Sequence, residues 1–139
     1  MKLIKIAGAS LNQTPFAWDG NKGNILEAIR QARGDNVSIL CLPELCISGY
    51  GCEDMFLSSD VIETSSEILG EILPYTSGLA VGIGLPLLYQ NKIYDSVAFV
   101  VDRKVIGFVP KKYLAGDGLH YEPRWFKPWP AAFCWTPMP

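Results

Sequence analysis

Two kinds of apolar pattern alternate along the first part of the chain. Nearly unbroken apolar runs cover residues 3–9, 37–42 and 79–85, and runs of this length are typical of strands that are covered on both faces. Residues 24–33 and 59–73 instead place apolar side chains three and four positions apart, which predicts two amphipathic helices. Because helix-length segments join consecutive strands, we expect a βαβαβ unit whose three strands are parallel.

The next part of the chain predicts a β-hairpin. Residues 96–101 and 104–109 are largely apolar, and the short connection Asp102-Arg103 joins them. Gly82 and Gly84 interrupt the preceding strand, which indicates either a bulge or the close approach of another stretch of backbone. The fold class is therefore α/β, a βαβαβ unit followed by a β-hairpin.

The C-terminal part of the chain has no such periodicity. Residues 116–130 are a loop rich in proline, glycine and aromatic residues, into which Arg124 and Lys127 are interleaved. Such a loop can stack nucleic-acid bases or pack onto the body of the protein, and the acidic net charge favours packing. Residues 131–139 follow no pattern and their origin stays open, so we divide the chain into a domain at 1–130 and a tail at 131–139.

The composition indicates one globular domain. The 139 residues are 49% hydrophobic and 19% charged, which excludes a disordered chain. Twelve Lys and Arg residues against fourteen Asp and Glu residues give a net charge of −2, which offers no basic surface to nucleic acid. Neither an apolar run of membrane-spanning length nor a signal peptide is visible. We expect a soluble, cytoplasmic protein without a nucleic-acid or membrane partner.

The cysteines do not indicate metal or redox chemistry. Cys41, Cys46, Cys52 and Cys134 fit no metal-binding spacing and His120 is the only histidine, so we expect no metal site. In a chain without a secretory signal the thiols are expected to be reduced. Cys41 lies within an apolar strand and is expected to be a small core side chain.

Glu44 is the first candidate for chemistry. It closely follows the strand at 37–42, and the carboxyl ends of parallel strands are where open α/β sheets build their sites. Apolar neighbours would desolvate its carboxylate, and we expect this to raise its pKa toward that of a general base. A solvated acid at a strand end is the alternative. Lys111, at the end of the strand at 104–109, favours the catalytic interpretation, and we expect the two side chains to meet.

Four segments carry a family resemblance. They are Pro43-Glu44-Leu45-Cys46-Ile47-Ser48-Gly49-Tyr50, Glu53-Asp54-Met55-Phe56-Leu57, Pro110-Lys111-Lys112-Tyr113-Leu114 and Tyr121-Glu122. In this order they resemble the nitrilase, or carbon–nitrogen hydrolase, superfamily, and they are most similar to the N-terminal glutaminase domain of glutamine-dependent NAD synthetases. The resemblance extends from about Leu3 to about Pro130.

The resemblance implies a fold and a reaction. The family fold is a four-layer α-β-β-α sandwich of two halves, of which this chain would supply the first. In the family a cysteine thiolate attacks the side-chain amide of the substrate glutamine, and ammonia and then glutamate are released. Glu44 would be the general base and Lys111 would stabilise the oxyanion, with Lys112 as the competing choice. Glu122 would position the lysine or the substrate amine, and a solvent-exposed carboxylate is the alternative for it.

The resemblance also implies what this segment lacks. ATP and Mg²⁺ would belong to a separate synthetase domain, so no cofactor is expected here. The family's nucleophilic cysteine lies well beyond the lysine, whereas this chain ends at Pro139 and Cys134 does not match the nucleophile strand. We therefore expect an N-terminal part of a glutaminase domain that is inactive alone. The alternatives are a small amidase that uses Cys134, and a non-enzymatic protein that binds a partner through an uncovered sheet face. That face also predicts a homo-oligomer or self-association.

Overall fold

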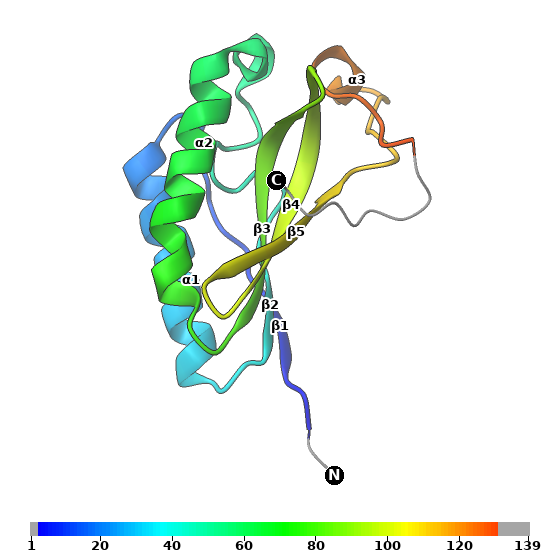
Figure 1. The fold of residues 1–139 in the computed structure, drawn as a ribbon. Coiled ribbons are helices and arrows are strands. Elements are labelled where there is room, and N and C mark those ends of the chain that lie inside the picture. Colours follow the sequence, from blue (N-terminus) through cyan, green and yellow to red (C-terminus); the bar gives the residue numbers. More distant parts are fainter. Residues whose placement is uncertain (1–2, 131–139) are drawn as a thin grey trace.

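The computed structural model describes residues 3–130, which form one five-stranded sheet with helices packed against it (Figure 1). The strands lie in chain order across the sheet: β1 (Ile6–Gly8), β2 (Ile39–Cys41), β3 (Ala80–Tyr89), β4 (Lys92–Val101) and β5 (Lys104–Pro110). The first three strands pair in parallel and the last two are antiparallel. The predicted α/β class, with a βαβαβ unit followed by a hairpin, is confirmed.

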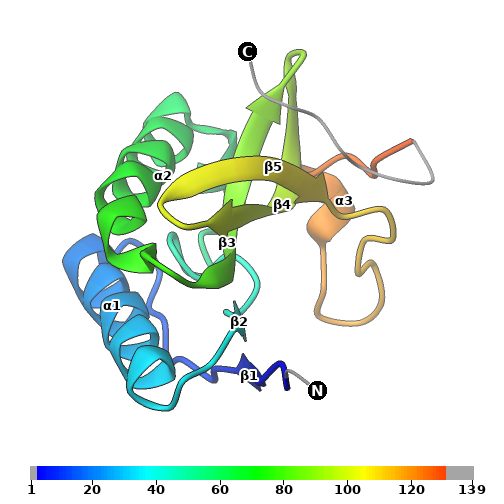
Figure 2. The same cartoon turned by 60° about the horizontal axis from the view of Figure 1, so that its bottom comes forward.

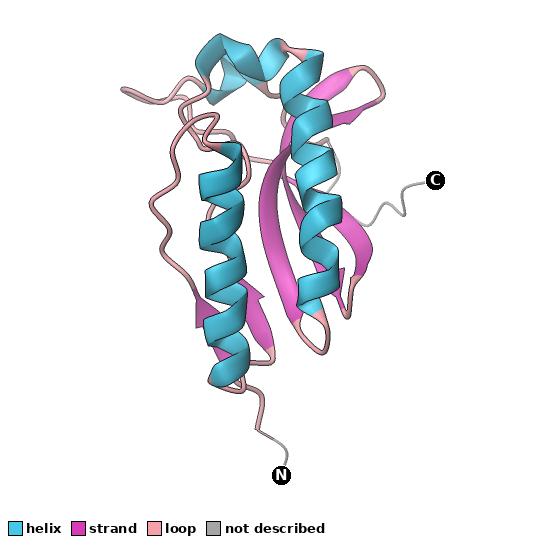
Figure 3. Ribbon diagram, turned by 90° about the vertical axis from the view of Figure 1, so that its left-hand side faces the viewer, coloured by secondary structure: helices cyan, strands magenta, loops and turns pink. Residues whose placement is uncertain are grey.

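Two long helices cover one face of the sheet. α1 (Trp18–Gly34) and α2 (Ser59–Ile72) lie side by side in front of the strands in Figure 3. The short helices are η1 (Glu53–Leu57), η2 (Leu73–Thr76) and α3 (Glu122–Trp125). Figures 1 and 2 place α3 on the side of the sheet away from α1 and α2.

The main core lies between the two long helices and the strands. The helices bury apolar side chains toward the sheet, among them Ile25, Ile29, Ile68, Leu69 and Ile72. The strands contribute side chains of one face, among them Leu40, Val81, Ile83, Ala98 and Phe108. These are the positions that the helical stripes and apolar runs predicted for the core, because each element buries its apolar face against the other.

Several element boundaries differ from the sequence prediction. α1 begins at Trp18 rather than near residue 24. The buried side-chain amide of Asn21 donates hydrogen bonds to the carbonyls of Thr14 and Ile47, and this holds the first turn in place. β3 and β4 run past their predicted ends and form a second hairpin, whose turn at Gln90 and Asn91 takes positive φ at both residues. Part of the predicted loop at 116–130 is helical, as α3.

The other face of the sheet is open over much of its area. Ile6 is 68% exposed, Val109 is 50% exposed and Phe99 is 36% exposed, and strand pairing places all three on the same face as Cys41. The prediction that Cys41 is a core side chain is wrong, because no layer within residues 3–130 covers this part of the face and Cys41 is exposed. The predicted uncovered face is present on the first two strands. It is not present along β3, where Gly84 lies under the loop that carries Glu44.

We expect this open face to make the chain self-associate. The wild-type chain should scatter light as a species larger than its 15.3 kDa monomer and should bind a hydrophobic dye. Val109→Lys, which introduces a charge on the open face, should shift the chain toward monomer and lower dye binding. Tyr75→Lys is the control, because Tyr75 is 52% exposed in η2, away from this face. A wild-type chain that is monodisperse, monomeric and silent to the dye would contradict the expectation.

Candidate active site

The loop that carries Glu44 folds back over the end of β3. The Leu42 amide donates to the Gly82 carbonyl at 3.0 Å, and the Ile47 amide donates to the Gly84 carbonyl at 3.2 Å. A Cβ atom on Gly84 would lie 2.5 Å from backbone atoms of both Pro43 and Leu45. The glycine is therefore required by a close backbone approach, which was one of the two interpretations of the glycines in this strand.

A second, smaller core fixes this loop to α3. The cluster consists of Leu45, Cys52, Phe56, Val61 and Phe126, and all five side chains are buried. Phe56 of η1 and Phe126, just after α3, have ring centroids 4.9 Å apart in a tilted arrangement. Leu45 reaches the cluster through a left-handed backbone with φ of 48°, which sends its side chain inward directly after Glu44. We call these five residues the site-loop cluster.

Lys111 meets Glu44 as the sequence predicts. It follows β5, and its amide donates to the Asp95 carbonyl of β4 at 2.8 Å, which continues the strand pairing up to the site. Its Nζ lies 2.5 Å from Oε1 of Glu44, although 67 residues separate the two in sequence. Lys112 points elsewhere, with its Nζ 5.5 Å from the ring centroid of Tyr113. Of the two candidate lysines, the geometry therefore brings Lys111 to the site.

Glu122 joins the same ammonium from α3. Its side chain is 1% exposed, and its Oε1 accepts hydrogen bonds from Lys111 Nζ at 2.9 Å and from the Tyr50 hydroxyl at 2.8 Å. Its Oε2 accepts from the Ala115 amide at 2.7 Å. Three donors compensate the burial of this carboxylate. The alternative of a solvent-exposed Glu122 is therefore wrong, whereas its role in binding stays a prediction.

An ion pair on the surface holds α3 against η1. Arg124 donates to both carboxylate oxygens of Asp54, at 2.5 and 2.7 Å, and the Trp125 indole donates to Asp54 at 2.9 Å. Both charged partners are more than half exposed, so the pair contributes little stability by itself. Its bidentate geometry fixes the orientation of α3, from which Glu122 projects. Arg124, one of the two basic residues of the C-terminal loop, thus has a packing role.

Sequence reasoning missed two residues of the site. Asp95 of β4 is 4% exposed, and its Oδ2 lies 3.7 Å from Lys111 Nζ. Tyr50 donates to Glu122 from the end of the Glu44 loop, 72 residues away in sequence. Asp95 gives a signal only once β4 is known to begin at Lys92, because an aspartate is unusual within a strand. Tyr50 gave none beyond its place in the motif, because its partner is distant in sequence.

The pKa of Glu44 shifts in the direction opposite to the sequence prediction. Burial, which raises the pKa of Glu44, is outweighed by hydrogen bonds with Asp95 and Lys111 and by the charge of Lys111, so the pKa falls. The predicted rise assumed apolar surroundings and is wrong. For Lys111, burial lowers the pKa, but the hydrogen bonds to Glu44 and Glu122 outweigh it and the pKa rises. In the resting site Lys111 is therefore an ammonium and Glu44 a carboxylate.

The carboxyls of the site surround an ammonium. Glu44, Asp95 and Glu122 each place an oxygen within 4.8 Å of the others, a spacing that can also hold a metal ion. Lys111 Nζ bonds two of these three side chains directly, so its ammonium supplies the positive charge that a metal would otherwise supply. We assign no metal to this cluster.

The two cysteines of the Glu44 loop are unsuited to nucleophilic attack. Burial raises the pKa of Cys46 to about 12, and burial also raises the pKa of Cys52. Both side chains are buried, and each thiol donates to a backbone carbonyl. A thiol with a raised pKa is a poor nucleophile because little thiolate is present near neutral pH. Cys134 lies outside the described residues.

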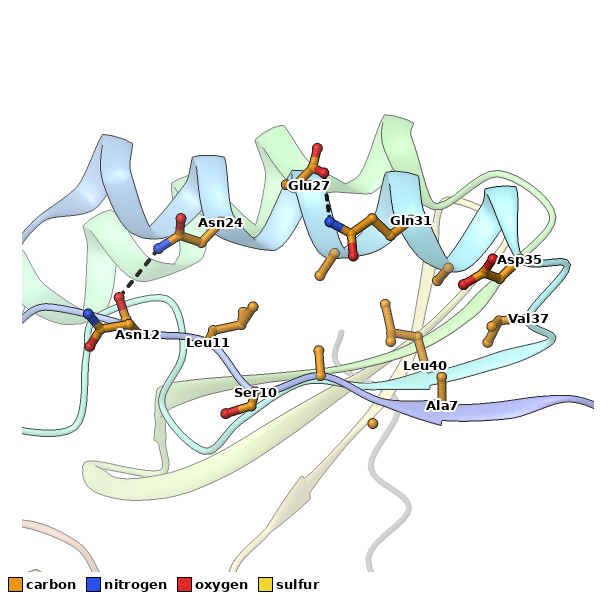
Figure 4. Close-up of a pocket in the computed structure, with 14 residues that line it drawn as sticks. Ala7, Ser10, Leu11, Asn12, Asn24, Glu27, Gln31, Asp35, Val37 and Leu40 are labelled. Carbon is orange, nitrogen blue, oxygen red and sulfur yellow. Dashed lines mark hydrogen bonds between the residues drawn. The ribbon is translucent and has the colours of Figure 1, made fainter.

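A cavity of about 500 Å³ lies between β1 and α1, at the edge of the sheet (Figure 4). Its polar rim includes Asn24, Glu27 and Gln31, and its floor includes Ala7 and Leu40. None of the residues that line it belongs to the cluster that Glu44, Asp95 and Glu122 form with Lys111. Within residues 3–130, no helix combines the length and the apolar character that crossing a lipid bilayer requires.

Comparison with known proteins identifies the family of this chain. The carbon-nitrogen hydrolase family matches residues 5–131. The chain belongs to this family. An amidase from Nesterenkonia sp. supports the fold alone: its structure aligns with a TM-score of 0.74 at 20% identity, over 92% of this chain and 49% of the amidase.

The more similar proteins of this family are glutamine-dependent NAD(+) synthetases. The crystal structure of one from Cytophaga hutchinsonii is 48% identical with a TM-score of 0.91, over 94% of this chain and 22% of that chain. Curated relatives include those of Saccharomyces cerevisiae, 38% identical over 91% of this chain, and of Oryza sativa subsp. indica, 37% identical over 93%. This carbon–nitrogen hydrolase chain spans 18% of the length of each of these two relatives.

Proposed function

We propose that this chain supplies the general-base side of a glutamine amidohydrolase site of the NAD synthetase type. One observation carries the proposal: a single ammonium, Lys111, is bonded by Glu44 and Glu122 at the end of the sheet. The substrate class is supported by the similarity to glutamine-dependent NAD(+) synthetases, the most similar of those named above being 48% identical. In such a protein, the ammonia released would amidate deamido-NAD in a separate domain that uses ATP and Mg²⁺.

In this mechanism Glu44 moves the protons. Its carboxylate accepts the proton of a cysteine thiol while the sulfur attacks the amide carbon of glutamine. The proton then passes to the amide nitrogen, the C–N bond breaks, and ammonia leaves an acyl-enzyme. Glu44 next takes a proton from water, whose oxygen attacks the thioester; glutamate leaves and the thiol regains its proton. Each completed half of the reaction returns Glu44 to its carboxylate form.

Lys111 stabilises the oxyanion that forms in both halves of the reaction. An ammonium has three N–H donors, and two of them bond Glu44 and Glu122. The third is left for the developing oxygen charge of the substrate. As that charge forms, it draws Lys111 away from Glu44. The contribution of Lys111 to the lowered pKa of Glu44, which is second to that of the hydrogen bond with Asp95, therefore weakens when a base is needed. The substrate amine is assigned to Glu122, as the resemblance implies.

We propose that the nucleophile comes from outside residues 3–130. Cys46 and Cys52 are buried thiols with raised pKa values, and neither fits the role. Residues 3–130 alone would then be inactive, because removing the nucleophile of such a unit costs several powers of ten in rate. A small amidase that uses Cys134 is the second candidate. We place the protein in the cytoplasm, since Cys41, Cys46 and Cys52 form no disulfide within residues 3–130.

A chimera tests the proposal. Residues 3–130 would replace the matching segment of the Cytophaga hutchinsonii NAD(+) synthetase, which is 48% identical to the chain. The chimera should release ammonia from glutamine, as measured by a coupled ammonia assay. Failure of a folded chimera to do so would contradict the proposal.

The isolated chain should release no measurable ammonia from glutamine. If it does and Cys134→Ala abolishes the release, the small-amidase candidate is correct. If folded chimera and isolated chain are both inactive, a non-enzymatic binding role through the open sheet face is favoured.

A further inference from the structure

We infer that Asp95 is a positioning residue, which retains a proton in the site and donates a hydrogen bond from its carboxyl to Glu44. The role in catalysis rests on the proposed function of Glu44, whereas the protonation of Asp95 does not. Asp95 lies on β4 directly opposite Pro86 of β3, and its backbone carbonyl accepts from Lys111. It is thus built into the sheet beneath the lysine rather than placed on a loop.

The two buried carboxyls differ in the hydrogen bonds that they receive. Glu122 and Asp95 are 1% and 4% exposed, but Glu122 accepts three hydrogen bonds. Asp95 Oδ2 is buried and receives none from residues 3–130, and Lys111 Nζ at 3.7 Å is beyond hydrogen-bond distance. A buried carboxylate oxygen without a donor is costly, whereas a protonated carboxyl carries its own donor. The geometry therefore suits an O–H group at Asp95.

The charges of the cluster also favour one protonated carboxyl. Three carboxyls, on Glu44, Asp95 and Glu122, lie within 4.8 Å of one another and share one ammonium. With all three ionised the cluster would carry two excess negative charges, and like charges at this spacing raise the pKa of one member. Glu44 is 41% exposed at its side chain and Glu122 has its donors, so Asp95 holds the proton. Tyr50 donates to Glu122, and the electrostatic effect of the neighbouring His120 also lowers the pKa of Glu44.

The electrostatics of the two neighbours agree with this assignment. Burial, together with the hydrogen bond to Glu44 and its charge, raises the pKa of Asp95 to about 8. The same hydrogen bond, with Lys111, lowers the pKa of Glu44. Below about pH 8 the donated proton thus keeps Glu44 ionised and fixes its carboxylate beside Lys111. Above it, Asp95 becomes a second anion that competes with Glu44 for the lysine.

Carboxyl NMR on the full chain tests the inference without any activity. The ¹³Cγ resonance of Asp95, assigned through its own backbone, should titrate near pH 8. The resonance of an ordinary aspartate, by contrast, titrates at about pH 4. The spectrum remains accessible if the 15.3 kDa chain dimerises. In Asp95→Asn, which keeps a donor, the pKa of Glu44 should stay low, whereas in Asp95→Ala it should rise. Ser96→Ala, equally buried on the same strand, should leave it unchanged.

Thermal unfolding gives an independent readout. A carboxyl whose pKa is raised on folding stabilises the protein below its unfolded pKa of about 4 and loses that contribution as pH rises to its folded pKa. The unfolding temperature of Asp95→Asn relative to wild type should therefore increase from about pH 4 to about pH 8 and then stay constant. Ser96→Ala should show no such trend.

The outcomes separate this inference from the proposed function. Titration of Asp95 below pH 5, or a wild-type and Asp95→Asn pair with parallel pH dependence of unfolding, would overturn the inference. Titration near pH 8 together with an inactive chimera would overturn the proposed function and leave the proton assignment standing. A Glu44 pKa that does not respond to Asp95→Ala, in a folded variant, would remove the positioning role.

Discussion

Glu44→Gln should lower kcat for glutamine hydrolysis by the chimera about 10²- to 10⁴-fold, the usual contribution of a positioned general base. The amide matches the carboxylate in size, so the loop over β3 and its bonds to Gly82 and Gly84 should remain. What disappears is the capacity to take a proton from the thiol and from water. Ammonia release measures the effect, and thermal unfolding shows whether the fold is kept.

Glu67→Gln is the matched control for this experiment. Glu67 lies on the exposed surface of α2, and Glu67→Gln makes the same chemical change there. This variant should retain wild-type activity. A Glu44→Gln chimera that is as active as the control would show that another group accepts the proton. The assignment of Glu44 as base would then be wrong, even though its contact with Lys111 stands.

Gly84→Ala should destabilise the chain by about 1–3 kcal/mol, the usual cost of forcing extra volume into a packed region. The added Cβ would lie 2.5 Å from Leu45 N and Pro43 O, and both are backbone atoms that no rotamer change can move away. The loop must lift from β3, which weakens the Ile47-to-Gly84 hydrogen bond and moves Glu44 away from its partner. Chemical denaturation of the chain measures the loss, and the chimera should lose glutamine hydrolysis.

Gly70→Ala should have the opposite effect on the stability of the chain. Gly70 lies in α2 and a Cβ there meets nothing within 4 Å, so alanine should stabilise the helix by about 0.4–1 kcal/mol. If Gly84→Ala were as stable as wild type, the loop would have to accommodate the methyl group by a rearrangement. Retained hydrolysis in that variant would show that the close approach does not set the position of Glu44.

The sequence by itself determined the order and type of the five strands and the two long helices, and the placement of the two catalytic candidates. The apolar runs and helical stripes report burial that repeats locally, with a period set by strand or helix geometry. They therefore predicted the parallel strands and the hairpin at Asp102-Arg103. Glu44 and Lys111 follow strands, and strand ends at one edge of a sheet meet. Their contact was predictable for that reason.

Only the tertiary structure decided the electrostatics of the site. The local sequence around Glu44 is apolar and indicates a raised pKa, but Lys111 and Asp95 reach it from other strands and reverse the direction. Asp95 lies in the part of β4 that precedes residue 96, which was not predicted as strand. Tyr50 donates to Glu122, which lies 72 residues away in sequence. Coulomb interactions and hydrogen bonds depend on distance in space, which a pattern along the chain does not encode.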